Sequence, residues 1–374
     1  MPPTIDPRLQ DAVIFAVPQS DSADQLARRL HDAGIATANA DAGTLAEVSR
    51  RLGARAERSA VIAGDADAVI AGRDGGFSMV IGIGTADDLA EHGADAVVDN
   101  VGAIQVRTGD SRMSEIPNAV ASFGQIADAL SGRPAVCLDY DGTLSAIVPD
   151  PDSAELVDGA ADALARLAER CPVAILSGRD LADIRYRVGV PGLWYAGSHG
   201  FESVAPDGSY RQNEDAAAAV PVLEEAAAQL RKTLESIGGI RVEHKRFAVA
   251  IHYRDVAVDQ VGTVVAATYR VGHREHLRVT NGRKVVELRP DVDWNKGSTL
   301  DWICEQIEQE QPVLPIYLGD DLTDEDAFDA IRADGIGILV RHTEDGDRPS
   351  AARFTLDSPD QVLEFLDRLA HTLS

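Results

Sequence analysis

The chain contains little cysteine, few cations relative to its acids, and no long apolar segment. Its 374 residues include three cysteines, Cys137, Cys171 and Cys304, and no Cys-x-x-Cys pair. An odd number of isolated cysteines argues against a disulfide framework and predicts free, buried thiols in a reducing compartment. No apolar run is long enough to cross a bilayer, and the first residues lack the basic and apolar stretches of a signal peptide. We therefore expect a cytoplasmic protein with no membrane partner.

Acidic residues greatly outnumber basic ones. Asp plus Glu number 61 and Lys plus Arg number 35, which gives a formal net charge of −26 at pH 7. A surface of this charge repels nucleic acid as well as anionic membranes, so neither is an expected partner. A phosphorylated small-molecule substrate would need a local cation to offset the overall negative field.

The most informative segment directly follows a short apolar run. Residues 135–138 have the pattern of a buried parallel strand, and Asp139-Tyr140-Asp141-Gly142-Thr143 comes next. One carboxylate can attack phosphorus while its neighbour gives a proton to the leaving oxygen, and the backbone N–H groups of the turn can hold phosphate oxygens. The segment resembles the first signature motif of the haloacid dehalogenase superfamily of phosphatases. This resemblance implies that Asp139 is the nucleophile and Asp141 the general acid and base.

Three further motifs follow in the order expected for that superfamily. The strand 173–176 ends in Ser177-Gly178-Arg179, and Lys296 lies where an amphipathic helix begins. The strand 315–318 then opens into residues 319–326, which carry five carboxylates. Such a cluster at the carboxyl end of a strand favours a hard divalent cation, and Mg²⁺ takes oxygen ligands of this kind.

The four motifs together imply a role for each residue. Ser177 and Lys296 are expected to hold the phosphoryl oxygens, and Thr143, Gly178 and Arg179 are assigned to substrate binding. The expected Mg²⁺ ligands are Asp139, Asp141 through its backbone carbonyl, and Asp320, with Asp324 as a further ligand or as a partner of a ligand.

Residues 209–290 separate the second motif from the third and have a different pattern. A helical segment, 216–237, precedes an alternating apolar pattern from Phe247 onward, and a second helical segment covers 258–269. Asn281-Gly282 is a typical hairpin turn between two strands. We predict a small α/β cap with an antiparallel sheet, which would exclude water and select the leaving group.

The cap and its neighbours narrow the resemblance to one family. Residues 197–202, the pair Glu243 and Lys245, the pair Lys284 and Glu287, and the acidic segment 319–328 together resemble trehalose-6-phosphate phosphatases. The resemblance covers residues 133–374 and implies that these four cap side chains bind sugar hydroxyls. A solvated sheet face is the alternative interpretation of the four side chains. His199 is expected to support its loop or to touch the sugar.

Residues 1–115 alternate strand-like and helical patterns, which predicts a parallel α/β layer. They resemble a haloacid dehalogenase core in which Ala16 and Pro18 replace the two aspartates. We interpret this part as a degenerate, non-catalytic copy with a role in structure, assembly or regulation, through which the chain could self-associate or contact a partner. An ordinary α/β domain with chance similarity is the alternative.

The expected fold class is α/β with a Rossmann-like three-layer core. The parts are an N-terminal domain (1–115), a linker helix (116–132), a catalytic core (133–208 and 291–374) and a cap (209–290). The expected activity is Mg²⁺-dependent hydrolysis of trehalose-6-phosphate to trehalose and phosphate through an aspartyl-phosphate. Two alternatives are an enzyme for another sugar phosphate, such as a sucrose-phosphate phosphatase or a phosphomutase, and a non-enzymatic sugar-phosphate sensor or scaffold.

Overall fold

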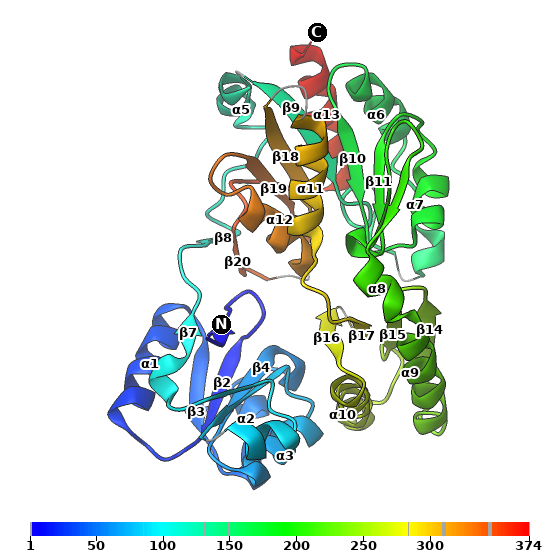
Figure 1. Cartoon of the computed structure of the whole chain (residues 1–374). Coiled ribbons are helices and arrows are strands. Elements are labelled where there is room, and N and C mark those ends of the chain that lie inside the picture. Colours follow the sequence, from blue (N-terminus) through cyan, green and yellow to red (C-terminus); the bar gives the residue numbers. More distant parts are fainter. Residues whose placement is uncertain are drawn as a thin grey trace. The chain divides into compact units, whose positions relative to one another are not determined.

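The computed structural model describes residues 2–84, 86–130, 132–148, 150–282, 284–308, 312–342 and 346–373. The chain divides into two compact units (Figure 1). Unit 1 comprises Met1–Thr108 and Ala218–Asp291, and unit 2 comprises Gly109–Ala217 and Val292–Ser374. Each unit is therefore assembled from two separate stretches of sequence.

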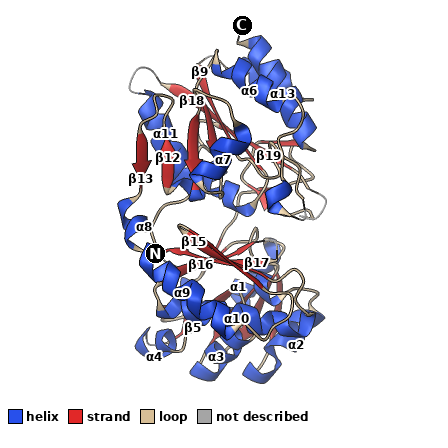
Figure 2. Cartoon of the chain, turned by 90° about the vertical axis from the view of Figure 1, so that its right-hand side faces the viewer, coloured by secondary structure: helices blue, strands red, loops and turns tan. Residues whose placement is uncertain are grey.

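The centre of unit 2 is an eight-stranded sheet with the order β13-β12-β11-β10-β9-β18-β19-β21. Figure 2 shows β13 and β12 at one edge of this sheet. The six strands from β11 to β21 are parallel, and β12 and β13 are antiparallel at one edge. In sheet order, the strands are β13 (Tyr210–Gln212), β12 (Glu202–Val204), β11 (Trp194–Gly197), β10 (Val173–Leu176), β9 (Arg133–Leu138), β18 (Val313–Gly319), β19 (Ile336–Val340) and β21 (Phe354–Leu356). The predicted parallel α/β core is confirmed.

Helices cover both faces of this sheet because side chains alternate along each strand. Val136 and Leu138 of β9 enter one apolar cluster together with α6 (Ala160–Ala168), α7 (Leu181–Val188) and α13 (Pro359–Thr372). Cys137, between them, enters a second cluster with α11 (Lys296–Glu308) and α12 (Glu325–Ala330). This three-layer arrangement buries β9 on both sides, which explains why its sequence is continuously apolar.

The described residues of segment 116–132 form one short helix, α5 (Phe123–Ala129), within the linker helix predicted there. The Phe123 ring lies edge-on to Phe365 of α13, with centroids 5.7 Å apart, and Ile126 is buried. A two-stranded sheet of β8 (Ser111–Arg112) and β20 (Pro349–Ser350) also lies in unit 2. The segment thus packs onto the core of unit 2.

The N-terminal part of unit 1 has a parallel five-stranded sheet with the order β3-β2-β4-β5-β6. The strands are β2 (Ala12–Ala16), β3 (Ala36–Asn39), β4 (Ser59–Ala63), β5 (Met79–Ile83) and β6 (Ala96–Val98), and the helices are α1 (Asp21–Asp32), α2 (Leu45–Arg51), α3 (Ala66–Asp74) and α4 (Ala86–Glu91). The first and last strands of this part, β1 (Thr4–Ile5) and β7 (Gln105–Val106), form a separate two-stranded parallel sheet. The predicted α/β layer is confirmed.

The cap is an antiparallel sheet with the order β14-β15-β17-β16, as predicted. Helix α8 (Glu214–Ala218) ends at the first cap residue of unit 1. The elements of the cap are α9 (Val220–Thr233), β14 (Arg241–Lys245), β15 (Ala248–His252), α10 (Val258–Arg274), β16 (Leu277–Gly282) and β17 (Val285–Pro290). Val249, Ile251, Val286 and Leu288 point to one face and pack with residues of α9 and α10. The other face carries charged and polar side chains.

The predicted hairpin turn at Asn281-Gly282 is wrong. Both residues belong to β16, where Asn281 pairs with Val286 and Gly282 with Val285. In this register β16 ends at Gly282 and β17 begins at Val285, and Lys284, just before β17, has a left-handed φ of 57°. The observed register places Val279 opposite Leu288. This apolar pairing determines the strand register more strongly than the local turn preference of Asn281-Gly282 does.

Helix α10 joins the N-terminal sheet to the cap within unit 1. The Tyr269 hydroxyl donates to the Ser78 carbonyl over 3.1 Å, and the Arg73 guanidinium carbon lies 5.1 Å from the Tyr269 ring centroid. Arg270 pairs with Asp74 at 3.1 Å. Arg73 also pairs with Asp95, whose pKa is lowered because His273 and Arg73 outweigh the opposing effect of burial.

Cys137 and Cys171 are buried free thiols, as expected, whereas Cys304 is partly exposed. The expectation of burial is therefore wrong for Cys304 of α11, which packs against the same apolar cluster as Cys137 but is only partly buried. Across the described residues, no helix combines the length and apolar character needed to span a membrane.

Candidate active site

Five parallel strands of unit 2 end at the same edge of the sheet and deliver the site residues. Asp139 follows β9, Ser177 follows β10 and Asp320 follows β18, with β9 lying between the other two strands. The Asp139 backbone N–H donates to the Leu318 carbonyl over 2.8 Å, which fixes the start of its loop. Ligands bind at this carboxyl edge in open α/β sheets.

Three buried carboxylates, from Asp139, Asp320 and Asp324, each place one oxygen within 4.8 Å of the others. Lys296 reaches two of them, with its Nζ 2.9 Å from Asp139 Oδ1 and 2.6 Å from Asp324 Oδ1. Burial raises the pKa of Asp139 well above its usual value; Lys296 opposes this shift, and the neighbouring carboxylates add to it. Burial alone would lower the pKa of Lys296, but Asp139 and Asp324 raise it above its ordinary value.

The charge balance of this cluster fits a divalent cation. Three carboxylates face one ammonium group, which leaves net negative charge in a buried site. Oxygen ligands of this type suit Mg²⁺ or another hard cation. The predicted residues Asp139 and Asp320 lie together in the cluster, whereas the side chain of Asp141 does not belong to it.

The two oxygens of Asp324 are fully occupied by hydrogen bonds. Oδ1 accepts from Lys296 and, over 2.6 Å, from the Tyr317 hydroxyl. Oδ2 accepts from the backbone N–H groups of Asp320 and Asp321, both over 2.9 Å. A carboxylate offers about four acceptor positions, so these four bonds leave none for a metal ion. Of the two roles open to Asp324, this geometry favours the partner of a ligand.

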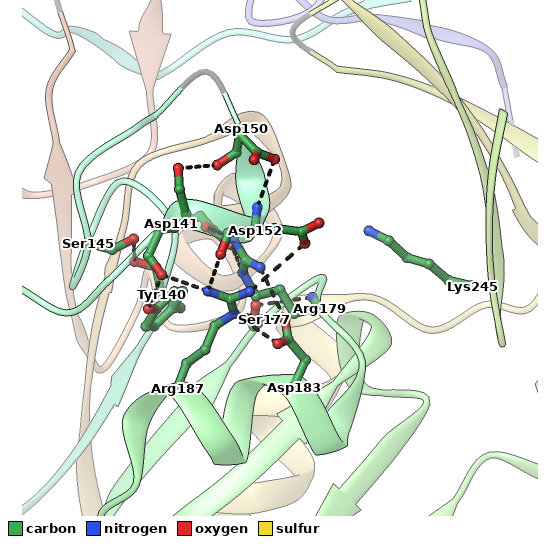
Figure 3. Close-up of polar contacts among 12 residues, drawn as sticks. Tyr140, Asp141, Ser145, Asp150, Asp152, Ser177, Arg179, Asp183, Arg187 and Lys245 are labelled. Carbon is green, nitrogen blue, oxygen red and sulfur yellow. Dashed lines mark hydrogen bonds and ion pairs between the residues drawn. The ribbon is translucent and has the colours of Figure 1, made fainter. Parts of the chain in front are cut away.

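Asp141 is held by the guanidinium of Arg179 (Figure 3). Arg179 donates from Nε to Asp141 Oδ2 over 2.7 Å and from Nη2 to Oδ1 over 2.6 Å. Its Nη1 reaches Asp183 at 3.1 Å, and Arg187 pairs with Asp183 in turn. Burial opposes the charged form of Arg179, but the two aspartates raise the pKa of its guanidinium above the ordinary value. Arg179, predicted from sequence as a substrate contact, holds the expected acid in this structure.

The remaining predicted residues line the same edge. The Ser177 hydroxyl accepts from the Arg179 backbone N–H over 3.1 Å, and the buried Thr143 hydroxyl has no hydrogen-bond partner among the described residues. A side chain at Gly178 would come within 2.6 Å of His199 Nε2. His199 itself has a left-handed φ of 56° and donates its N–H to the Ser177 carbonyl over 2.9 Å. His199 therefore packs against the turn at Ser177 and Gly178, as the loop-supporting interpretation expects.

Sequence reasoning missed two residues of the site, Tyr317 and His342. His342 Nε2 lies 3.1 Å from the Gly142 carbonyl and 3.3 Å from Asp320 Oδ2, so it bridges two of the loops. It stands two residues beyond the end of β19. The sequence could have revealed His342, because a polar residue shortly after a parallel strand belongs at the same sheet edge as the motif residues that follow β9, β10 and β18.

Three of the four predicted cap residues share the polar face of the cap sheet in unit 1. Glu243 lies opposite Ala250, which lies opposite Glu287, and Lys245 is two residues from Glu243 on β14. Arg289 pairs with Glu287. Lys284 is separate from this row because it stands in the exposed β16–β17 loop.

Gly142 gives a test of how tightly the acidic loops pack. Its φ is +79°, and a Cβ there would overlap the Asp320 carboxylate. Gly142→Ala should therefore displace Asp320 and lower the turnover of a reaction at this site by at least about 100-fold, the scale of a misplaced catalytic group. The matched control is Gly192→Ala, because Gly192 has the same φ of +79° but no atom within 4 Å of its Cβ position. The control should lose only about 1–2 kcal/mol of stability and keep its turnover. Equal turnover losses in the two variants would contradict the predicted overlap.

Comparison with known proteins places this geometry in a family. The family model described as trehalose-phosphatase matches residues 137–360. A trehalose-phosphate phosphatase of Mycobacterium marinum is 54% identical over 99% of this chain and 98% of its own length. One of Mycobacterium tuberculosis is 52% identical over 100% of this chain and 97% of its own length. The N-terminal part lies within both of these matches.

Solved structures agree at the level of the fold. The C-terminal domain of a Candida albicans trehalose-6-phosphate phosphatase has a TM-score of 0.59 and 23% identity, covering 71% of this chain and 99% of its own. A trehalose-6-phosphate phosphatase related protein has a TM-score of 0.55 and 24% identity, covering 63% and 97%. With this fold, the carboxylate cluster and more than half of the sequence identical to its relatives, the chain belongs to the trehalose-phosphatase family.

Proposed function

We propose that the protein hydrolyses trehalose-6-phosphate to trehalose and inorganic phosphate with the aid of Mg²⁺. The observation that carries this proposal is the complete carboxylate and lysine set at the edge of the unit 2 sheet, found in a member of this family. A non-enzymatic sensor would have no use for a buried cluster of three like charges, which costs stability.

In this proposal, the Mg²⁺ ion is held by Asp139, the backbone carbonyl of Asp141 and Asp320. When bound, a divalent cation neutralises charge on the phosphoryl oxygens and orients the group for displacement. Asp324 positions Lys296 and the backbone of the acidic loop through its four hydrogen bonds. The donor set fits the ion because its two side-chain oxygens are hard ligands and carry net negative charge.

The residues of the chain then carry the covalent chemistry. Asp139 attacks phosphorus to form an aspartyl-phosphate, and the bond from phosphorus to the sugar oxygen breaks. Asp141 gives a proton to the departing oxygen and next takes one from the water that cleaves the intermediate. Asp141 must leave its paired position with Arg179 to do so, because both of its oxygens accept from that guanidinium in this structure. Lys296 and the Ser177 and Thr143 hydroxyls would hold the phosphoryl oxygens.

The decisive measurement is phosphate release from trehalose-6-phosphate, beside glucose-6-phosphate and sucrose-6-phosphate, with Mg²⁺ and with EDTA. We expect a preference of at least about 100-fold for trehalose-6-phosphate, since unpaired polar groups in a site built for hydroxyls are costly. EDTA should abolish turnover and Mg²⁺ should restore it. A preference for another sugar phosphate would keep the chemistry and remove the substrate assignment, whereas no release from any would favour the sensor.

The N-terminal domain is included in the proposal as a non-catalytic, degenerate copy of the core. Its strand β4 lies beside β2 and is followed by Gly64 and Asp65, as β18 lies beside β9, ends at Gly319 and is followed by Asp320. Asp65 instead caps α3 by accepting from the Ala68 N–H over 2.9 Å. Among the described residues, the cluster of carboxylates that could hold a metal ion lies in unit 2.

We also propose that the chain is organised in four parts. These are a domain at 1–115, a linker helix at 116–132, a core at 133–208 and 291–374, and a cap at 209–290. A cytoplasmic location is likewise a proposal. The remaining prediction is self-association or partner contact through the N-terminal domain. Sedimentation of the intact chain over a range of concentrations would test self-association. A sedimentation coefficient independent of concentration, at the value for a monomer, would contradict self-association.

A further inference from the structure

Glu243 depends on a neighbouring strand for its position on the polar face of the cap. It lies on β14 directly opposite Ala250 of β15, and a methyl side chain offers nothing to hold a carboxylate. The residue two positions beyond Ala250 on the same face is His252. Long side chains can reach such a diagonal neighbour across two strands.

His252 makes this contact at hydrogen-bond distance, with its Nε2 2.8 Å from Glu243 Oε2. The contact is the largest cause that lowers the pKa of Glu243 to about 2. Glu243 is therefore ionised at neutral pH and can only accept, so the imidazole must carry its proton on Nε2. This bond fixes one of the two oxygens of Glu243.

The other partners of Glu243 are too distant to fix it. Lys245 Nζ is 3.9 Å from Oε1, and an Arg241 guanidinium nitrogen is 3.7 Å from Oε2. Both distances exceed hydrogen-bond length. The Glu243 side chain is 37% exposed, and in the described part of the chain the cation nearest to Oε1 is the Lys245 ammonium group at 3.9 Å, so Oε1 can accept from a ligand hydroxyl. Without His252, the carboxylate could turn toward either cation instead.

We propose that His252 is a positioning residue for sugar recognition, which pins Glu243 Oε2 so that Oε1 can accept a hydroxyl of the substrate. The inference rests on the proposed function, because it assigns Glu243 to the sugar. It adds a residue of β15 that never touches the phosphoryl group.

Two substitutions of His252 separate positioning from a general structural role. In His252→Gln, the amide nitrogen can occupy the place of Nε2 and donate to Glu243. In His252→Asn, the amide reaches only as far as Nδ1 and cannot. We expect His252→Asn to raise KM for trehalose-6-phosphate about tenfold to a hundredfold, the effect of losing one hydrogen bond to a charged group. His252→Gln should stay within about threefold of the unchanged protein, because it keeps the hydrogen bond.

Three comparisons complete the experiment. Turnover of p-nitrophenyl phosphate, which has no sugar, should be the same in all variants. Glu243→Gln combined with His252→Asn should raise KM no further than Glu243→Gln alone, because His252 acts through Glu243. His276→Asn is the matched control, because His276 is an exposed cap histidine whose left-handed φ of 52° asparagine tolerates. It should leave both substrates unaffected.

The outcomes distinguish this inference from the function on which it rests. If the unchanged protein shows no preference for trehalose-6-phosphate, the proposed function fails first. If that preference is present but the Asn and Gln variants of His252 behave alike, the positioning role is overturned. A parallel loss of p-nitrophenyl phosphate turnover would also overturn it, since only a general structural defect lowers both.

Discussion

Asp139→Asn should lose phosphatase turnover by at least about 10⁴-fold, the scale seen when an enzyme loses its nucleophile. The amide is close in shape to the carboxylate and can remain beside Lys296, but it is a poor nucleophile and cannot form the aspartyl-phosphate. Substrate binding should survive, because the cap residues and the Ser177 hydroxyl are unchanged. Phosphate release and calorimetric binding of trehalose-6-phosphate measure the two properties separately.

The same variant tests the N-terminal domain. If the sheet of β2 to β6 hydrolysed phosphate, turnover would persist in Asp139→Asn, since that change lies in unit 2. The thermal unfolding midpoint of the variant should not fall, because the substitution removes one of three mutually repelling buried carboxylates. Retained turnover in a folded variant would contradict the assignment of Asp139 as the nucleophile.

Lys296→Met should give the largest loss of stability together with a loss of turnover. Lys296 is fully buried and hydrogen-bonded to both Asp139 and Asp324. Methionine fills a similar volume but leaves two buried carboxylates without their cation, and breaking a buried pair in this way costs about 3–5 kcal/mol. Urea unfolding in EDTA measures this cost. Lys232→Met on the exposed side of α9 is the control and should change stability by less than about 0.5 kcal/mol.

The stability difference between Lys296→Met and the unchanged protein should depend on pH with a definite sign. The pKa of Asp139 is raised in the folded state by burial and by neighbouring carboxylates. An acid of this kind favours folding below its unfolded pKa, and the contribution is lost as pH rises through the folded pKa. Lys296 opposes this rise in the pKa of Asp139, so its removal raises that pKa further. The stability difference between Lys296→Met and the unchanged protein should therefore become smaller as pH falls. A difference that widens toward acid would contradict this electrostatic account.

The sequence predicted the parts of the site that local pattern determines. Apolar runs identify β9, β10 and β18, and motif residues directly after them must lie at one sheet edge, so Asp139, Ser177 and Asp320 could be placed together. The pairing of Asp141 with Arg179 could not be predicted, because it depends on side-chain conformations in the folded state. The occupation of the Asp324 carboxylate oxygens by hydrogen bonds could not be predicted either, because it depends on where the Tyr317 hydroxyl and two backbone N–H groups point.

Other misses have equally physical causes. Strand β3 has the sequence Ala-Thr-Ala-Asn and is partly exposed at the sheet edge, so it carries no apolar signal. The β16–β17 loop was misplaced because alignment of Val279 with Leu288 outweighs the local preference of Asn281-Gly282. Cys304 was expected to be buried, but a helical pattern does not show how much of a given side chain remains exposed to solvent.

The position of β9 in the sheet has a consequence for how the protein folds during its synthesis. One edge of β9 pairs with β10, which follows soon after it, but the other pairs Arg133 with Val313. A nascent chain must therefore keep the open edge of an apolar strand unpaired while the whole cap emerges from the ribosome. Open edges of this kind favour aggregation and non-native pairing. We expect refolding yield to fall steeply with protein concentration, and chaperones that shield apolar segments to raise it.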